Sequence, residues 1–178
     1  MINLAGVFFG LVLLLSQQVI ASDVDVEYKV KAGYLYNFTK FITWPEDSSA
    51  SFNLCIVGDD PFGDLIDPIE QRTAFGRPIK LYRFKQVNKS QRCHILFISA
   101  GINDNTLPKA TLVVRDVNKT LTVGENDDFA AQGGMIGFVN RQGKIKLQIN
   151  LELLQQSDLK ISAKLLEVAE LIGAETHD

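Results

Sequence analysis

The chain has 178 residues, of which 46% are hydrophobic and 22% are charged, and its formal net charge is −3. A chain of this size and composition can bury one sizeable core, so the sequence predicts a single folded domain. Its lysines and arginines are scattered rather than gathered into a basic face, which argues against a nucleic-acid-binding protein.

The N-terminal residues have the pattern of an export signal. Leu4 to Leu15 is an apolar run of about twelve residues, too short to span a bilayer comfortably. Val19 and Ala21 then stand at the positions that a signal peptidase recognises. We therefore predict a signal peptide over 1–21 and a mature domain over 22–178. An N-terminal membrane anchor is the alternative, because no Lys or Arg precedes the apolar run.

The first predicted element is a helix from Asp25 to Ile42, whose apolar residues repeat at helical spacing. It must end before Trp44, since Pro45 disfavours helical backbone at the residue before it. Core packing explains most of the aromatic side chains here, whereas an exposed share would serve contact with a partner. We take three of them as candidate partner-binding residues: Tyr34, Tyr36 and Trp44.

Two runs of consecutive apolar residues predict strands that are covered on both faces, as in a parallel sheet. They are Phe52–Val57 and Cys93–Ser99, and they contain the two cysteines of the chain, Cys55 and Cys93. In an oxidising compartment two cysteines more often form a disulfide than remain free. We therefore predict a bridge between two strands of one sheet, with two buried free thiols as the alternative.

The segments around these strands alternate between helix and strand. Pro61 is expected to begin a helix that Asp60 caps and that ends near Arg72. Ile79–Phe84 alternates between apolar and polar residues, which predicts an edge strand or one wet face. Asn103–Val117 has features of both strand and helix, and the alternation favours a helix.

The C-terminal part predicts a short strand over 121–123, a helical turn over 127–131, and a hairpin with arms 135–140 and 144–150. A three-residue loop with Gly143 at positive φ joins the arms. A last helix, capped by Gly173, has one apolar face: Ile161, Leu165, Val168, Ala169 and Ile172. Together these elements predict an α/β fold, a three-layer α/β/α sandwich whose mostly parallel sheet has an antiparallel hairpin at its edge.

No catalytic apparatus is visible in the sequence. Cys93 and His94 are neighbours in a strand and point to opposite faces, which argues against a nucleophile–base pair and favours a packed or hydrogen-bonded His94. An acidic cluster lacks the spacing of a calcium-binding loop, and capping or solvation explains its members: Asp59, Asp60, Asp64 and Asp67. We predict no catalytic, metal or cofactor site, and a binding or regulatory protein rather than an enzyme.

Five stretches of the chain, taken in order, resemble one family. They are AGYLYNFTKF with Trp44-Pro45, CIVGDDPFG, CHILFI, GGMIGF, and Ile149–Leu151 followed by ISAKLL. Their order and spacing are similar to those of the YfiR-like periplasmic proteins, over about Tyr28 to Leu171.

The resemblance implies a periplasmic regulator that binds the periplasmic sensor portion of an inner-membrane diguanylate cyclase and represses it. Repression lowers cyclic-di-GMP signalling and biofilm formation. The resemblance also implies a homodimer that does not itself span the membrane, and sensitivity to oxidation through Cys55 and Cys93. Some relatives carry a second cysteine pair, which this chain lacks. Relatives also tend to have Ser-Asp where this chain has Gly124-Glu125.

Two other functions remain open on the sequence. A small-molecule-binding module that feeds a histidine kinase or a transporter would use the open end of the sheet. That end lies near Gly58–Gly63, Gly101 and Gly124. A periplasmic hydrolase would need a nucleophile and a base in one cleft, and the sequence shows no such pair.

Overall fold

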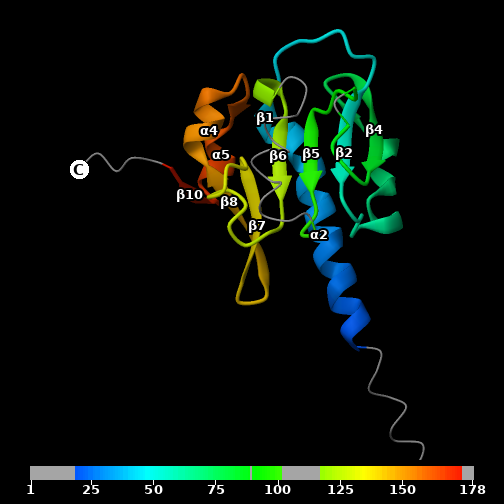
Figure 1. The fold of residues 1–178 in the computed structure, drawn as a ribbon, viewed down its shortest axis with the longest axis vertical. Coiled ribbons are helices and arrows are strands. Elements are labelled where there is room, and N and C mark those ends of the chain that lie inside the picture. The colour runs from blue at the N-terminus through cyan, green and yellow to red at the C-terminus, as the bar shows by residue number, and fades with distance from the viewer. Residues whose placement is uncertain (1–18, 89, 102–116, 174–178) are drawn as a thin grey trace, which may run out of the picture.

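The structure is a computed structural model that describes residues 19–88, 90–101 and 117–173. An eight-stranded sheet with the order β10-β8-β7-β6-β5-β2-β4-β3 forms its centre (Figure 1). The strands are β2 (Phe52–Val57), β3 (Thr73–Ala74), β4 (Arg77–Phe84), β5 (Ile95–Ile98), β6 (Leu121–Gly124), β7 (Ile136–Arg141), β8 (Lys144–Asn150) and β10 (Glu170–Ile172). A second, two-stranded sheet pairs β1 (Ile42–Thr43) with β9 (Lys160–Ile161).

The main sheet is mixed. Strands β4, β2, β5, β6 and β7 pair in parallel, whereas β8 is antiparallel to β7 and β3 is antiparallel to β4. The helices are α2 (Val19–Phe41), α4 (Leu151–Gln156) and α5 (Ala163–Leu166), and the 3₁₀ turns are η2 (Gly63–Leu65), η3 (Asp67–Gln71) and η4 (Val117–Lys119). The α/β class predicted from the sequence is confirmed.

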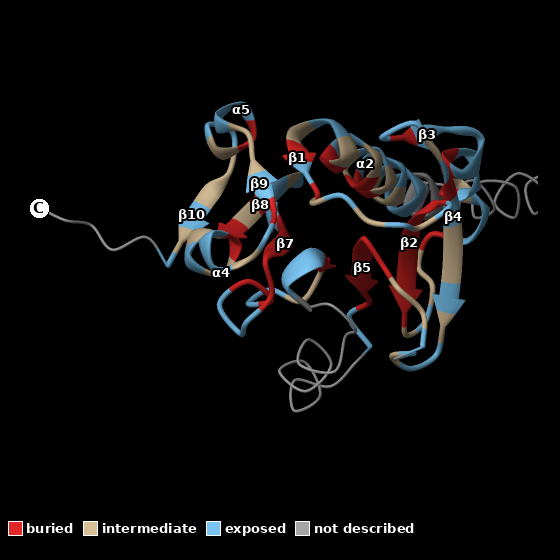
Figure 2. Ribbon diagram, turned by 90° about the horizontal axis from the view of Figure 1, so that it is seen from above, coloured by how far each residue is buried: buried red, intermediate tan, exposed pale blue. Residues whose placement is uncertain are grey.

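Helix α2 covers one face of the sheet (Figure 2). Leu35 and Phe38 of this helix are fully buried, and the Phe38 ring lies 6.3 Å from that of Phe138 on β7. The N-terminal end of α2 extends beyond the sheet (Figure 1), where Val24 and Val26 are half exposed. The predicted helix is therefore present, although it begins at Val19, and its apolar stripe packs on the sheet around Leu35 and Phe38 but leaves Val30 42% exposed.

The central strands β2 and β5 are buried on both faces, as their continuous apolar runs predicted. On β2, Leu54 and Ile56 face α2, whereas Cys55 and Val57 face the opposite side, where Phe129 packs over them. Phe129 belongs to the predicted helical turn, in which the N–H of Gln132 donates to the Asp128 carbonyl at 2.8 Å.

Two predicted details of local structure are wrong. The segment from Pro61 to Arg72 forms the 3₁₀ turns η2 and η3 rather than one α-helix, because Pro68 lacks the N–H that a continuous helix needs. Its predicted start is also wrong, since η2 begins at Gly63 with Phe62 at the N-cap, and Asp60 Oδ1 accepts the N–H of Phe62 at 2.8 Å in the turn before it. The loop between β7 and β8 has two residues, not three: Gln142 and Gly143, both with positive φ, form a type I′ turn.

The predicted C-terminal helix is also wrong. Its residues divide into β9, α5 and β10, and Leu171 of β10 pairs with Ile149 of β8. Pairing with β10 provides hydrogen-bond partners for the backbone of β8, which would otherwise be an open sheet edge. In this arrangement Val168, predicted to lie on the apolar helix face, is 62% exposed. The β7–β8 hairpin is consequently not the edge of the sheet. The predicted helix at Asn103–Val117, needed for a third layer, falls almost entirely outside the described residues.

Candidate functional site

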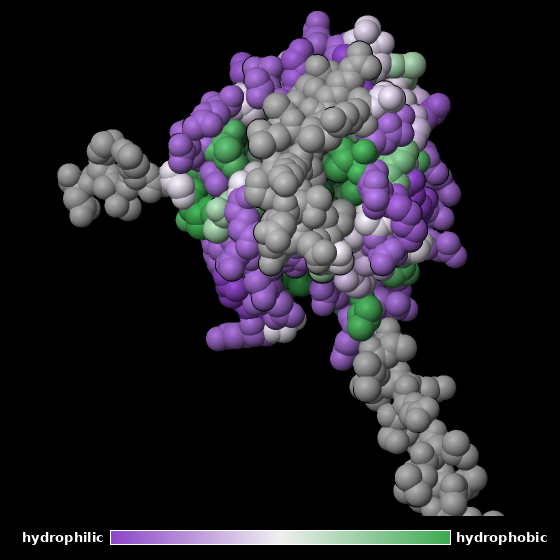
Figure 3. Space-filling view, in the orientation of Figure 1, coloured by the Kyte–Doolittle hydropathy of each residue, from purple (hydrophilic) through white to green (hydrophobic). Residues whose placement is uncertain are grey.

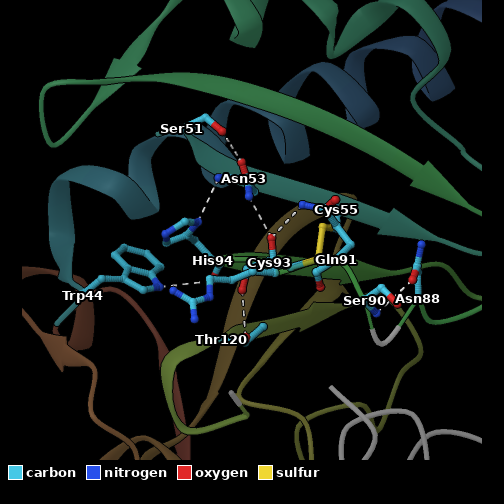
Figure 4. Close-up of a disulfide and its surroundings, with 11 residues drawn as sticks. Trp44, Ser51, Asn53, Cys55, Asn88, Ser90, Gln91, Cys93, His94 and Thr120 are labelled. Atoms are coloured by element: carbon cyan, nitrogen blue, oxygen red, sulfur yellow. Dashed lines mark hydrogen bonds between the residues drawn. A yellow bond between two sulfur atoms is a disulfide. The ribbon is translucent and has the colours of Figure 1, made fainter. Parts of the chain in front are cut away.

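A disulfide joins Cys55 of β2 to Cys93, two residues before β5 (Figure 4). The two Cα atoms are 5.8 Å apart, and both side chains are buried on the sheet face opposite α2. Hydrogen bonds hold the backbone around Cys93 in addition to the disulfide. Thr120 Oγ1 donates to the Cys93 carbonyl at 2.8 Å, and Asn53 Nδ2 donates to the Arg92 carbonyl at 2.9 Å. The predicted bridge is present, and it links β2 to the segment that leads into β5, the strand that pairs with β2.

His94 points to the opposite face from Cys93, as expected for adjacent residues in a strand (Figure 4). Its Nδ1 accepts the N–H of Asn53 at 2.9 Å, so the proton of the neutral ring is on Nε2, which lies 2.8 Å from Asp47 Oδ2. Burial lowers the pKa of His94, although Asp47 opposes the shift. His94 is therefore a neutral, fully hydrogen-bonded core residue.

Asp47 connects this histidine to β4. It accepts the N–H of Ser49 at 2.9 Å and the guanidinium of Arg77 at 2.5 Å. Burial raises the pKa of Asp47, but these bonds and the one to His94 outweigh burial and hold the pKa well below its ordinary value. The arrangement has the Asp–His half of a hydrolase triad, yet the third position is a backbone N–H rather than a nucleophile. It holds the loop before β2 in place.

The carboxyl end of the parallel strands, where α/β folds bind ligands, contains a buried ion pair. Lys31 Nζ of α2 lies 2.8 Å from Glu125 Oε2, just after β6, and both side chains are only 6% exposed. Glu125 Oε1 also accepts the N–H of Ala100 at 3.2 Å. Burial lowers the pKa of Lys31, but Glu125 and Glu27 outweigh it and raise the pKa, so Lys31 stays charged. Lys31 and Glu125 are thus paired with each other at this end.

Two of the glycines in this region, Gly124 and Gly134, lie against a side chain of the protein itself, whereas Gly101 does not. A Cβ on Gly124 would lie 2.2 Å from the Phe129 ring, and one on Gly134 would lie 2.0 Å from it. These glycines therefore admit Phe129 rather than a ligand. Phe62, from the loop after β2, packs in the core on the α2 side of the sheet, with its ring 4.8 Å from that of Phe97. The small-molecule-binding alternative gains no support from this geometry.

The acidic cluster is paired with cations on β4 and just beyond it. Asp60 and Asp67 lie 2.6 Å from the Arg83 guanidinium, and Asp59 lies 2.7 Å from Lys85 Nζ. Within the described parts of the chain, no group of three or more His, Cys, Asp or Glu residues could hold a metal ion.

The three aromatic candidates lie in different environments. The Tyr34 ring packs 5.9 Å from Phe138, and Trp44 is 7% exposed with its indole N–H donating to the His94 carbonyl at 3.1 Å. Tyr36 is half buried and lines a cleft of about 170 Å³ between α2 and the turns η2 and η3. Tyr36 is therefore the candidate best placed to touch a partner, and the roles of Tyr34 and Trp44 stay predictions.

A family model described as YfiR/HmsC-like matches residues 28–170. The chain belongs to the YfiR/HmsC-like family. This family suggests a periplasmic regulator in diguanylate cyclase signalling. A search of curated proteins found no match to the chain. Over the described residues, no helix is both long and apolar enough to cross a membrane.

The sequence of this YfiR/HmsC-like chain does not predict the roles of several residues. Asp47 and Glu125 are single acidic residues in loops, and nothing local shows that a distant cation will bury them. Phe75 is 48% exposed at a positive φ of 53°, in the turn between β3 and β4, and its ring lies 5.8 Å from Trp44. The following Gly76 indicated a turn but not the exposed aromatic beside it. Across the described part of the face opposite α2, hydrophobic residues are scattered among hydrophilic ones (Figure 3).

Proposed function

We propose that this protein binds the periplasmic sensor portion of an inner-membrane diguanylate cyclase and represses it. In this role it lowers cyclic-di-GMP signalling and biofilm formation. The observation that carries the proposal is the family match over residues 28–170, which covers nearly all of the folded domain. The site geometry agrees with a binding role, because His94, Asp47, Lys31 and Glu125 are all occupied by contacts within the chain.

Repression of this kind is a shift of an equilibrium in the cyclase. The regulator must bind the inactive state of the sensor more tightly than the active state, because a ligand shifts an equilibrium only by its differential affinity. A 100-fold preference shifts the balance by about 2.7 kcal/mol, which is enough for a useful switch. A rigid domain loses less conformational entropy on binding than a flexible one, which strengthens binding to either state, so the preference must come from contacts that differ between the two states.

The disulfide gives the switch a redox input. A dithiol reductant would transfer two electrons and two protons to the bridge, leaving two thiols at Cys55 and Cys93 and a disulfide on the reductant. The strands β2 and β5 would keep their hydrogen bonds, but the closed loop of 38 residues would be released. We propose that the oxidised protein represses and that reduction weakens its hold on the cyclase.

The test is cytoplasmic cyclic-di-GMP in a strain that lacks this gene. We expect a rise that wild-type protein reverses and that a Cys55→Ala/Cys93→Ala variant reverses less completely. Crosslinking in cells, followed by mass spectrometry, then identifies the cyclase. An unchanged cyclic-di-GMP level under several growth conditions, with the protein shown to be expressed, would refute the repressor function. Full repression by a stably folded double variant would refute the redox input alone.

Two further parts of the proposal concern export and assembly. We propose a mature periplasmic protein that begins at Ser22 after cleavage of residues 1–21, and a homodimer in solution. The intact mass of protein purified from the periplasm tests the cleavage site. Light scattering during size-exclusion chromatography tests the dimer.

A further inference from the structure

A cleft lies between helix α2 and the segment that contains the 3₁₀ turns η2 and η3. Gly33 and Tyr36 line it from α2, Pro68 and Ile69 line it from η3, and Arg72 lines it from the position just after η3. Its volume of about 170 Å³ is smaller than the roughly 300–1,000 Å³ of typical small-molecule pockets. The cleft therefore suits one or two side chains of a protein segment better than a small ligand.

Gly33, which lines this cleft from α2 and is exposed, has no contact within the chain that requires a glycine. Glycine inside a helix costs about 1 kcal/mol relative to alanine, and a close neighbour that leaves no room for a Cβ usually explains it. Gly33 is not among the glycines with positive φ, and a Cβ there would meet nothing within 4 Å. Gly124 and Gly134 differ, because the Phe129 ring fills the space above them. A group from outside the chain that rests on the helix backbone would explain Gly33.

The rim of the cleft is positively charged, although the whole chain carries a net charge of −3. Lys29 and Arg72 line the cleft, and the Tyr36 ring lies 5.7 Å from the Arg72 guanidinium and 4.6 Å from Lys40 Nζ. None of the lining residues is acidic.

The acidic side chains of η3 are turned toward β4 instead. Asp67 pairs with Arg83 at 2.6 Å, and Glu70 Oε1 accepts the N–H of Leu81 at 2.9 Å. These contacts leave the cations of the cleft facing outward without an adjacent carboxylate from η3. A negatively charged occupant is therefore the one that the charges favour.

We propose that this cleft is the docking site for an acidic segment of the partner protein. Backbone or a small side chain of that segment rests on Gly33, and its Asp or Glu side chains pair with Lys29 and Arg72. The identity of the partner as the periplasmic portion of a diguanylate cyclase rests on the proposed function. The cleft itself rests on the unexplained glycine and the cationic rim.

Gly33→Leu is the main test variant, because leucine favours helix and its side chain would fill the cleft. Gly101→Leu is the matched control, since a Cβ on Gly101 also meets nothing within 4 Å and φ there is not positive. For the charges, Arg72→Glu is compared with Lys80→Glu. Lys80 is exposed on β4 and points to the other sheet face, since its neighbour Ile79 packs in the core on the α2 side.

The probe is the purified periplasmic portion of the cyclase that crosslinks to the wild-type protein in cells. Its affinity for the oxidised mature protein is measured at low and at physiological salt. We expect Gly33→Leu and Arg72→Glu each to weaken binding at least about tenfold, and the two control variants to bind like wild type. Wild-type association should also slow as salt is added.

The outcomes separate the docking site from the function. Wild-type affinity in both Gly33→Leu and Arg72→Glu would overturn the docking site while leaving repression intact. If wild-type protein captures no cyclase and deletion of the gene leaves cyclic-di-GMP unchanged, the proposed function fails and the docking proposal falls with it. Should Gly33→Leu lose its helical circular dichroism, Arg72→Glu at its exposed position decides the question.

Discussion

Removal of the Cys55–Cys93 disulfide should cost this domain a large part of its stability. The bridge closes a loop of 38 residues, so the chain-entropy relation gives about 4 kcal/mol. Typical domains are stable by only about 5–15 kcal/mol in total. The perturbation is Cys55→Ala/Cys93→Ala, because alanine avoids the hydroxyl that serine would bury beside Val57 and Leu96.

The assay is urea unfolding of the mature protein, followed by circular dichroism with and without a reductant. We expect the double variant to unfold with a free energy about 3–5 kcal/mol lower than that of the oxidised wild type. Reductant should lower the free energy of unfolding of the wild type to nearly that of the variant, and it should not change the free energy of unfolding of the variant. A difference of less than about 1 kcal/mol would show that the hydrogen-bonded pair β2–β5 needs no bridge, and it would refute both the entropy estimate and the redox input built on it.

Three further predictions concern buried groups. Lys31→Met should destabilise the fold by about 3–5 kcal/mol in thermal unfolding, because it leaves the Glu125 carboxylate buried without a cation. The double variant Lys31→Met/Glu125→Gln should recover part of that loss of stability. His94 has a lowered pKa, so the unfolded chain takes up the proton first as the pH falls below about 6.5. Wild-type stability should then fall by up to about 1.4 kcal/mol per pH unit, and a smaller slope is expected for His94→Gln; equal slopes would contradict this. Gly134→Ala should cost at least about 1–3 kcal/mol, because its Cβ would overlap the Phe129 ring, and unchanged stability would show that the ring can move aside.

Local patterns in the sequence are enough to predict the central strands, the long helix and the bridge. The apolar runs of β2 and β5 leave no polar face, so these strands must be covered on both sides wherever they lie. The helical spacing of α2 and the stop before Pro45 are equally local. Two cysteines in such strands leave one pairing, and the family resemblance, confirmed over residues 28–170, rests on the same local motifs.

The sheet edge and the pairing of the buried charges depend instead on how the whole domain packs. The segment after Leu159 has helical spacing, yet Leu171 pairs with Ile149, because the unpaired backbone of β8 stabilises a strand there more than local propensity stabilises a helix. Lys31 and Glu125 are 94 positions apart in the chain, so no pattern of neighbours could reveal that they meet. The vacancy above Gly33 is likewise visible only once η2 and η3 have packed beside α2, since an empty space is a property of the folded neighbours and not of the residue.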